Sequence, residues 1–245
     1  MKVLDYLHRK LRDGKVHMTL LDPDKLPPEE TASLAVSARK AGTDALMVGG
    51  STGVTHEKVD ATVMAIKAKT DVPVILFPSS GEGLSRHADA LYFMSLLNSR
   101  DPRMIVGEQR LASRVVKQWG LETISMGYLL VEPGMRAGEI GKADLIRRTD
   151  HETAIQYALA AQFIGMDLVY LEAGSGAPEA VPPEMIRAVK KEILIPLVVG
   201  GGLRTPEAAR TAALAGADMV VTGTIVESSK DLSVLREIVR AVKGR

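Results

Sequence analysis

The sequence predicts a modified TIM barrel, (βα)8, in which eight parallel strands close into a ring that helices surround. Three observations predict it. Short apolar segments alternate with amphipathic ones along the whole chain. The length of 245 residues is close to the roughly 250 residues of such barrels. A Gly-x-Asp turn, at Gly42-Thr43-Asp44, Gly165-Met166-Asp167 and Gly216-Ala217-Asp218, recurs before an apolar segment. An open, doubly wound sheet is the competing architecture.

The strands are expected where short apolar runs are rich in β-branched residues. These runs lie at residues 16–21, 44–49, 72–77, 89–94, 122–131, 167–172, 194–199 and 218–222. Helices are expected between them and before them, at residues 3–12, 28–41, 55–69, 102–119, 151–164, 183–191, 206–215 and 231–243. Asp101-Pro102 and Thr205-Pro206 place a capping side chain before a proline, which is typical of a helix start.

One unit of the barrel is irregular. Only residues 78–88, rich in glycine and serine, separate the third strand from the fourth. This segment is too short for a helix with its two loops, so the helix after strand three is expected to be missing or replaced by a loop. The open flank would leave apolar barrel wall for a second subunit or an apolar ligand to cover. Residues 132–149 are expected to form a long polar loop and are a candidate lid.

Composition narrows the function. Hydrophobic residues make up 46% of the chain and charged residues 25%, which fits one domain over residues 1–245. The net charge of +1 without a basic block argues against nucleic-acid binding. The absence of cysteine excludes disulfides, thiolate metal sites and a cysteine nucleophile. The N-terminus resembles no signal peptide, and no apolar stretch reaches the roughly 18 residues of a membrane span. A cytoplasmic location is therefore expected.

Two glycine turns near the C-terminus give the first functional signal. Residues 197–202 read Leu-Val-Val-Gly-Gly-Gly, and residues 219–224 read Met-Val-Val-Thr-Gly-Thr. Each turn follows a buried strand and offers backbone N–H groups, to which the helix expected after Gly202 adds its positive end. The loops after strands seven and eight are the usual phosphate site of such barrels. The sequence therefore predicts a phosphorylated small-molecule ligand.

Carboxylates and hydroxyls at other strand ends suggest the chemistry. Asp22 ends the first strand and suits Mg²⁺ held together with substrate phosphate oxygens, although Asp22 and Asp24 could instead form a turn that caps the next helix. Ser51 could add a hydroxyl ligand or hydrogen-bond its own turn. Glu172 ends an otherwise apolar strand beside the predicted phosphate site and could deprotonate a substrate hydroxyl. The alternative for Glu172 is a structural salt bridge.

A serine hydrolase is a further alternative. Residues 49–53, Gly-Gly-Ser-Thr-Gly, match the G-x-S-x-G pattern between a strand and a helix. A catalytic triad also needs a histidine downstream, and no histidine has an evident place at a strand end. The hydrolase interpretation is therefore disfavoured, and the scattered histidines also argue against a histidine metal site.

Several segments together resemble one enzyme family along essentially the whole chain. They are 21–24 (Leu-Asp-Pro-Asp), 49–51 (Gly-Gly-Ser), 91–93 (Leu-Tyr-Phe), 97–99 (Leu-Asn-Ser), 127–128 (Gly-Tyr), 170–172 (Tyr-Leu-Glu), 200–202 (Gly-Gly-Gly) and 223–224 (Gly-Thr). Their order and spacing resemble the geranylgeranylglyceryl phosphate synthases of archaea and the related bacterial heptaprenylglyceryl phosphate synthases. The long segment between Asp22 and Ser51 is similar to that of the second group of the family.

The resemblance implies a Mg²⁺-dependent prenyltransferase that joins geranylgeranyl diphosphate to the 3-hydroxyl of sn-glycerol 1-phosphate. It implies Asp22 and Ser51 as magnesium ligands and Glu172 as the base. The implied glycerol phosphate site consists of Tyr170, Leu171, Glu172, Ala173, Gly174, Ser175, Gly176, Gly201, Gly202, Gly223 and Thr224. The missing helix would leave room for the prenyl chain.

One position departs from the family pattern, and it leaves the diphosphate contacts open. Some members carry a lysine two residues before the aspartate, where this chain has Leu20. Lys25, Arg100 or Arg103 could replace its anion contact. The aromatic residues Tyr92, Trp119 and Tyr128 are expected to line the prenyl site.

The resemblance also favours a homo-oligomer, dimeric or hexameric, and transient membrane contact for the lipid product. Two alternatives stay open: a heptaprenylglyceryl phosphate synthase, and another phosphate-handling barrel such as an isomerase or lyase. A catalytically silent binding barrel is disfavoured by Glu172.

Overall fold

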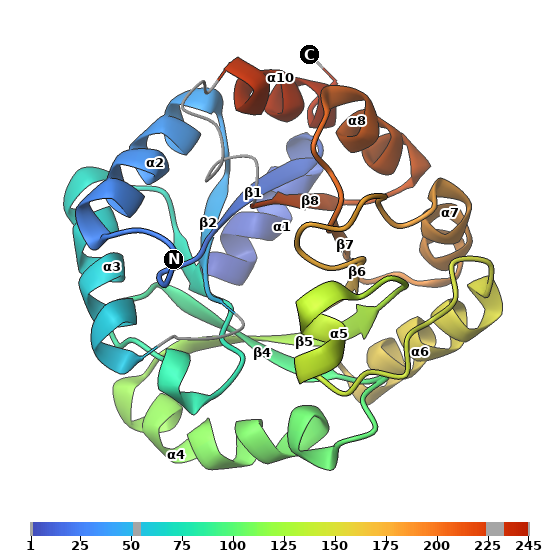
Figure 1. The fold of residues 1–245 in the computed structure, drawn as a ribbon, viewed down its shortest axis with the longest axis horizontal. Helices are drawn as coiled ribbons and strands as arrows, with labels where there is room; N and C mark the ends of the chain where they lie inside the picture. Colours follow the sequence, from blue (N-terminus) through green and yellow to red (C-terminus); the bar gives the residue numbers. More distant parts are fainter. Residues whose placement is uncertain (1, 51–54, 224–232, 245) are drawn as a thin grey trace.

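The computed structural model describes residues 2–50, 55–223 and 233–244. Its strands form a closed parallel barrel, β1 to β8 in sequence order, with β8 paired to β1 (Figure 1). They are β1 (Val16–Leu21), β2 (Ala45–Val48), β3 (Val74–Leu76), β4 (Ala90–Leu96), β5 (Glu122–Leu130), β6 (Leu168–Glu172), β7 (Leu197–Gly200) and β8 (Met219–Thr222). Each lies within a few residues of its expected range. The barrel is confirmed, and the open doubly wound sheet is wrong.

The helices are α1 (Val3–Asp13), α2 (Pro28–Ala41), α3 (His56–Lys69), α4 (Glu108–Trp119), α5 (Met135–Ile140), α6 (His151–Ile164), α7 (Pro183–Glu192), α8 (Pro206–Ala215) and α10 (Ser233–Val242). Most of them surround the barrel, whereas α1 lies behind its centre in Figure 1, with Val3 and Leu7 in the interior cluster. All but α5 were expected, and residues 231–232 of the last expected helix lie outside the described ranges. Among the described residues, no helix is both long and apolar enough to cross a membrane.

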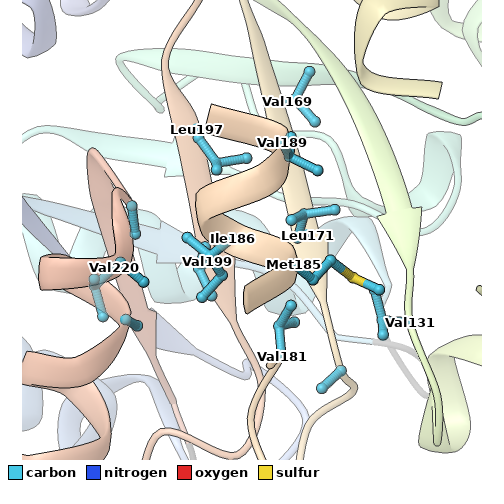
Figure 2. Packing of buried hydrophobic residues seen from close by; sticks show 14 of the residues in the cluster. Val131, Val169, Leu171, Val181, Met185, Ile186, Val189, Leu197, Val199 and Val220 are labelled. Carbon is cyan, nitrogen blue, oxygen red and sulfur yellow. The ribbon is translucent and has the colours of Figure 1, made fainter. Parts of the chain in front are cut away.

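Side chains alternate between the barrel interior and the layer under the helices, as the two-residue period of a strand requires. Val169 and Leu171 of β6 point outward and pack against Met185 and Val189 of α7 (Figure 2). Tyr170 belongs to the interior cluster. The next interior position is residue 172, so the strand period directs that side chain into the mouth of the barrel.

The unit after β3 differs from the regular pattern in the expected way. No α-helix lies between β3 and β4; a single 3₁₀ turn, Gly81–Gly83, takes its place. The flank is nevertheless not open, because α4 runs across it between α3 and α6 (Figure 1). A π-helical turn at Arg103–Gly107 precedes α4. The outward-pointing Leu91 of β4 is 2% exposed, so the chain itself covers most of the wall that was expected to be free.

The segment 132–149 is more ordered than a polar loop. It contains α5, and single bridges pair Val131 with Ile146 and Ser99 with Ala143. The buried Asn98 amide holds it, because its Nδ2 donates to the carbonyls of Leu130 (2.9 Å) and Asp144 (2.8 Å). The lid candidate is therefore a short helix fixed to the end of β4.

The seam between β1 and β8 contains a buried histidine. His17 lies next to β8 and under the helices, and its ring nitrogens are 3.0 Å from the hydroxyls of Thr43 and Thr222. Burial lowers the pKa of His17 to about 3; the nearby Asp44 carboxylate opposes this shift and the Lys243 ammonium adds to it. The imidazole is therefore neutral in the folded chain at ordinary pH.

This histidine should make the fold sensitive to acid. The unfolded chain binds a proton at His17 near pH 6.5 and the folded chain only near pH 3. The free energy of unfolding should therefore fall as pH drops through that window, by up to about 1.4 kcal/mol per pH unit. Urea unfolding of the wild type and His17→Gln between about pH 7 and about pH 5 measures this. The variant should show the shallower slope, and equal slopes would contradict the assignment.

Candidate active site

Two cavities lie at the carboxyl end of the barrel. The larger is an apolar groove that starts in the barrel mouth beside Tyr92 and Tyr128. It passes over the rim at Phe77 and reaches the space between β4 and α4, where Leu91 and Ala112 line it. Residues 77–81 with Leu84, from the segment that replaces the helix, form one side, and Ala137, Ile140 and Gly141 at α5 form another. This groove fits an elongated apolar ligand.

The smaller cavity has glycine-rich walls. Gly176, Gly201, Gly202 and Gly223 line it, together with Arg204. The carboxyl ends of β6, β7 and β8 thus meet with little side-chain bulk between them. Arg204 was not expected from the sequence, although its place directly after the glycine turn could have indicated it. Its guanidinium donates to the carbonyl oxygen of Gly176, so a positive charge lies at a wall built from backbone amides.

Glu172 lies where the two cavities meet. Both are lined by Leu20, Glu172 and Ser175. The Glu172 carboxylate is buried, and it accepts the Tyr170 hydroxyl at Oε2 (2.5 Å) and the Gly174 N–H at Oε1 (2.8 Å). In the described part of the chain no lysine or arginine pairs with it. The salt-bridge alternative is therefore wrong, and the carboxylate faces the cavities with two neutral donors.

Burial raises the pKa of Glu172, while the hydrogen bonds from Tyr170 and Gly174 oppose that shift. The removal of water disfavours the charged form, and donors to the charged form favour it. Burial also raises the pKa of Tyr170 and of Tyr128, and the Glu172 charge adds to both shifts. The two phenols therefore stay neutral, and Tyr170 donates its hydrogen bond to Glu172.

Aromatic rings pack around Tyr170, whose hydroxyl donates to this carboxylate. The Tyr128 ring lies edge-on to that of Tyr170, with centroids 5.3 Å apart, and Phe77 lies 5.5 Å from Tyr128 and 5.8 Å from Tyr170. Such pairs stabilise one another beyond the area they bury. They fix Tyr170, and with it the orientation of Glu172.

Asp22 lies at the carboxyl end of β1, separated from Glu172 on β6 by β7 and β8. A Cβ atom added to Gly50 would lie 2.4 Å from Asp22 Oδ1, so the carboxylate lies against the backbone of the turn after β2, and Gly49 and Gly50 line the groove. Oδ1 also accepts the Asp24 N–H (3.0 Å). The expected turn is thus present, but it does not cap α2, whose N-cap position is Pro27 without a side-chain bond. Ser51 lies outside the described residues.

A protein-only metal cage is absent from residues 2–50, 55–223 and 233–244, which contain no group of three acidic, histidine or cysteine side chains. Asp22 offers one hard oxygen ligand. A site of this kind suits Mg²⁺, which proteins commonly bind through one or two carboxylates together with substrate phosphates.

Some of the residues expected to contact the diphosphate or the prenyl chain line the groove, and others do not. Tyr92 and Tyr128 line the groove as expected, whereas Lys25, Arg100, Arg103 and Trp119 do not line it. The Lys25 N–H donates to the Asp22 carbonyl (3.2 Å), the Arg100 N–H donates to the Lys142 carbonyl (3.1 Å), and Arg103 pairs with Glu108. The Trp119 ring stacks on His56, with centroids 5.7 Å apart. Thr224 lies outside the described residues.

Comparison with known proteins identifies the family. The sequence model of the PcrB family matches residues 8–242. The chain belongs to the PcrB family. It is 53% identical to the geranylgeranylglyceryl phosphate synthase of Thermoplasma volcanium over 100% of this chain and 97% of that protein. It is also 53% identical to the enzyme of that name from Thermococcus kodakarensis, over 99% of this chain and 98% of that one.

A solved structure agrees. The (S)-3-O-geranylgeranylglyceryl phosphate synthase of Thermoplasma acidophilum, crystallised with its substrate sn-glycerol 1-phosphate, superposes with a TM-score of 0.98 at 52% identity over 100% of both chains. The PcrB-family chain described here is therefore an enzyme, a prenyltransferase. A tryptophan synthase α chain from Legionella pneumophila matches with a TM-score of 0.65 at 18% identity and shares the fold alone.

Gly201 should tolerate no side chain. Its φ is +78°, and an added Cβ would lie 2.3 Å from Glu172 Oε1 and 2.7 Å from the Gly174 nitrogen. Gly201→Ala should therefore displace the carboxylate and weaken binding of a small phosphate ester in this pocket about tenfold or more in a calorimetric titration. Gly81→Ala is the matched control, because a Cβ there meets nothing within 4 Å. Equal affinity in both variants would show that the turn adapts.

Proposed function

We propose that this enzyme is a geranylgeranylglyceryl phosphate synthase. It transfers the geranylgeranyl group from geranylgeranyl diphosphate to the 3-hydroxyl of sn-glycerol 1-phosphate, in a Mg²⁺-dependent reaction that releases diphosphate and forms the first ether bond of archaeal lipids. One observation carries the proposal: the buried Glu172 lines both an apolar groove and a glycine-rich pocket. A base at that junction can serve a reaction between an apolar donor and a phosphorylated acceptor.

The glycine-rich pocket is proposed as the glycerol phosphate site. The phosphate accepts hydrogen bonds from the backbone N–H groups of the turns at Gly176, Gly201–Gly202 and Gly223. The family resemblance adds Thr224 as a further contact. Thr205 caps α8 directly behind the β7 turn, so the positive end of that helix faces the same region. The remaining segment, residues 170–175, holds the glycerol, and the relative from Thermoplasma acidophilum was crystallised with this substrate.

Glu172 is proposed as the base. Its carboxylate takes the proton from the 3-hydroxyl of the acceptor, the hydroxyl oxygen forms a bond to C1 of the prenyl chain, and the C1–O bond to diphosphate breaks with its electron pair on the leaving group. Burial makes the carboxylate more basic. The Tyr170 and Gly174 donors hold both of its oxygens, so the base is oriented before the substrate arrives.

The donor is proposed to extend from the rim at Asp22 into the apolar groove. Asp22, with Ser51, would hold Mg²⁺, which when bound neutralises charge on the departing diphosphate. The apolar chain lies along Tyr92, Tyr128 and Leu91, which exclude water from the reacting carbon. Leu20 offers no charge to the diphosphate at the position where some family members have lysine, and Lys25, next to Asp22 in the turn, is the proposed substitute.

Heptaprenyl diphosphate is the alternative donor. The names of the relatives, which are 53% identical, favour the geranylgeranyl compound. We also propose a homo-oligomer, dimeric or hexameric, in the cytoplasm, with transient membrane contact when the lipid product leaves.

The proposal is tested by incubating the chain with radiolabelled sn-glycerol 1-phosphate, geranylgeranyl diphosphate and Mg²⁺, followed by extraction into organic solvent. Label should move into the organic phase. Glu172→Gln should lower turnover by at least about a hundredfold and leave glycerol phosphate binding nearly unchanged. Label that stays in water with every prenyl diphosphate tried would refute the proposed function.

The dependence of activity on pH should change when the hydrogen bond from Tyr170 to Glu172 is removed. Glu172 must be charged to act, so activity rises with pH through its raised pKa. Tyr170→Phe removes the donor that lowers this pKa, and the acid limb of kcat should therefore move to higher pH. Tyr128→Phe is the control, since no hydrogen bond joins Tyr128 to the carboxylate among the described contacts. An acid limb that stays in place in Tyr170→Phe would count against Glu172 as the titrating group.

Substitution of Asp22 should weaken binding of the prenyl diphosphate and leave binding of sn-glycerol 1-phosphate nearly unchanged. Asp22→Asn keeps the hydrogen bond to the Asp24 N–H and loses the charge that Mg²⁺ requires. Binding of geranylgeranyl diphosphate in the presence of Mg²⁺ should weaken about tenfold or more, and binding of sn-glycerol 1-phosphate should change by less than about twofold. Calorimetric titrations of both ligands compare the two sites, and the reverse order would refute the assignment.

A further inference from the structure

The segment that replaces the missing helix is fixed in place by a histidine from the neighbouring helix. His56 is the first residue of α3. Its Nδ1 lies 2.7 Å from the carbonyl oxygen of Leu84. A carbonyl only accepts, so Nδ1 carries the hydrogen and donates it. Leu84 is 2% exposed and lines the apolar groove. The bond therefore fixes the backbone of a residue that forms part of the groove wall.

The same imidazole also contacts α4. Its ring stacks on Trp119, the last residue of α4, with an angle of 25° between the planes. Trp119 does not line the groove. On the other side, Nε2 lies 3.5 Å from the carboxylate of Asp60, one turn further along α3. His56 therefore joins α3, the 77–88 segment and α4.

Other bonds attach the 77–88 segment at its barrel end. The Phe77 N–H donates to the Val48 carbonyl (2.8 Å). The Ser79 hydroxyl donates to the Gly50 carbonyl (3.2 Å), and the Gly81 N–H donates to Glu108 Oε2 (3.2 Å). These bonds hold the end of the segment near the barrel mouth. His56 holds the far end at Leu84, where the segment turns back toward β4.

We propose that His56 is a positioning residue for the apolar groove: it holds the 77–88 segment against α3 and α4 and thereby sets the width of the groove and its selection of prenyl chain length. This inference rests on the proposed function of the groove as the prenyl donor site. His56 contacts no reacting atom. Its effect is on the donor, because residues 77–88 contribute no wall to the glycine-rich pocket and His56 contacts the segment at Leu84, away from the Phe77 ring that packs on Tyr170.

Three substitutions of His56 remove its hydrogen bond to Leu84 and its ring contact with Trp119, separately or together. His56→Phe keeps a ring for Trp119 and loses the donor to Leu84, whereas His56→Asn keeps a donor near Nδ1 and loses the stack. His56→Ala loses both. Met64→Ala, on α3 at a side chain that is 48% exposed, is the control for general changes in that helix.

The KM for geranylgeranyl diphosphate should rise about tenfold in His56→Ala and His56→Phe, which corresponds to the loss of one hydrogen bond to a buried group. His56→Asn should recover most of that loss. The KM for sn-glycerol 1-phosphate should stay within about twofold throughout. The ratio of kcat/KM for heptaprenyl over geranylgeranyl diphosphate should rise in His56→Ala, since the freed wall gives way to the longer chain.

Trp119 provides a readout that needs no turnover, because it is the only tryptophan of the chain. Its emission should shift to longer wavelength in His56→Ala and His56→Asn and stay near the wild type in His56→Phe. An unchanged donor KM together with shifted emission would overturn the proposal, and so would equal rises of both KM values. Wild-type protein without any prenyl transfer would refute the proposed function instead, and the emission series would still show whether the three-way contact exists.

Discussion

The pairing of β8 with β1 closes the barrel and places residues from the two ends of the sequence at one rim. Val16–Thr19 lie beside Met219–Thr222 in parallel register, so Asp22 and Gly223 both follow the same seam. His17 spans this seam through its bond to Thr222, the residue directly before Gly223. The turn at Gly223 is thus anchored by a buried neutral group. The carboxyl ends of β1, β6, β7 and β8 keep a fixed separation because each of these strands is hydrogen-bonded to the next.

A buried carboxylate is the second constraint. Glu172 loses hydration without gaining a cation, and two hydrogen bonds offset part of that loss. The glycines of β7 serve this arrangement directly. A Cβ at Gly200 would lie 2.2 Å from the Tyr170 hydroxyl, and one at Gly201 would lie 2.3 Å from Glu172 Oε1. The glycines that the sequence analysis interpreted as a phosphate turn therefore also leave the space that the Glu172 carboxylate and the Tyr170 hydroxyl occupy.

The fold was predictable because its determinants are local. Strand period, helix caps and the recurring Gly-x-Asp turn each act within a few residues, and the period of β6 alone directs Glu172 inward. The placement of Trp119 and α5 depends on distant contacts. The π-helical turn at Arg103–Gly107 carries α4 across the flank and brings Trp119 to His56, away from the groove. Helix α5 has only six residues, with glycine at both caps, and it depends on Asn98 and the bridge between Ser99 and Ala143.

The loop that replaces a helix after β3 leaves room for an apolar cavity beside the polar one. In a complete barrel, a helix after β3 would occupy the space between β4 and α4, and the mouth would be the only entrance. Here that space belongs to the groove, which meets the polar pocket only at Leu20, Glu172 and Ser175. The polar site is built from β6, β7 and β8 and the apolar site from β3, β4 and α4. The glycine turns after β7 and β8 do not line the groove, whereas Phe77 and Tyr128 line it and also pack on Tyr170, the donor to Glu172. Changes to the groove wall away from these two rings should therefore alter the length of the apolar ligand without moving Glu172.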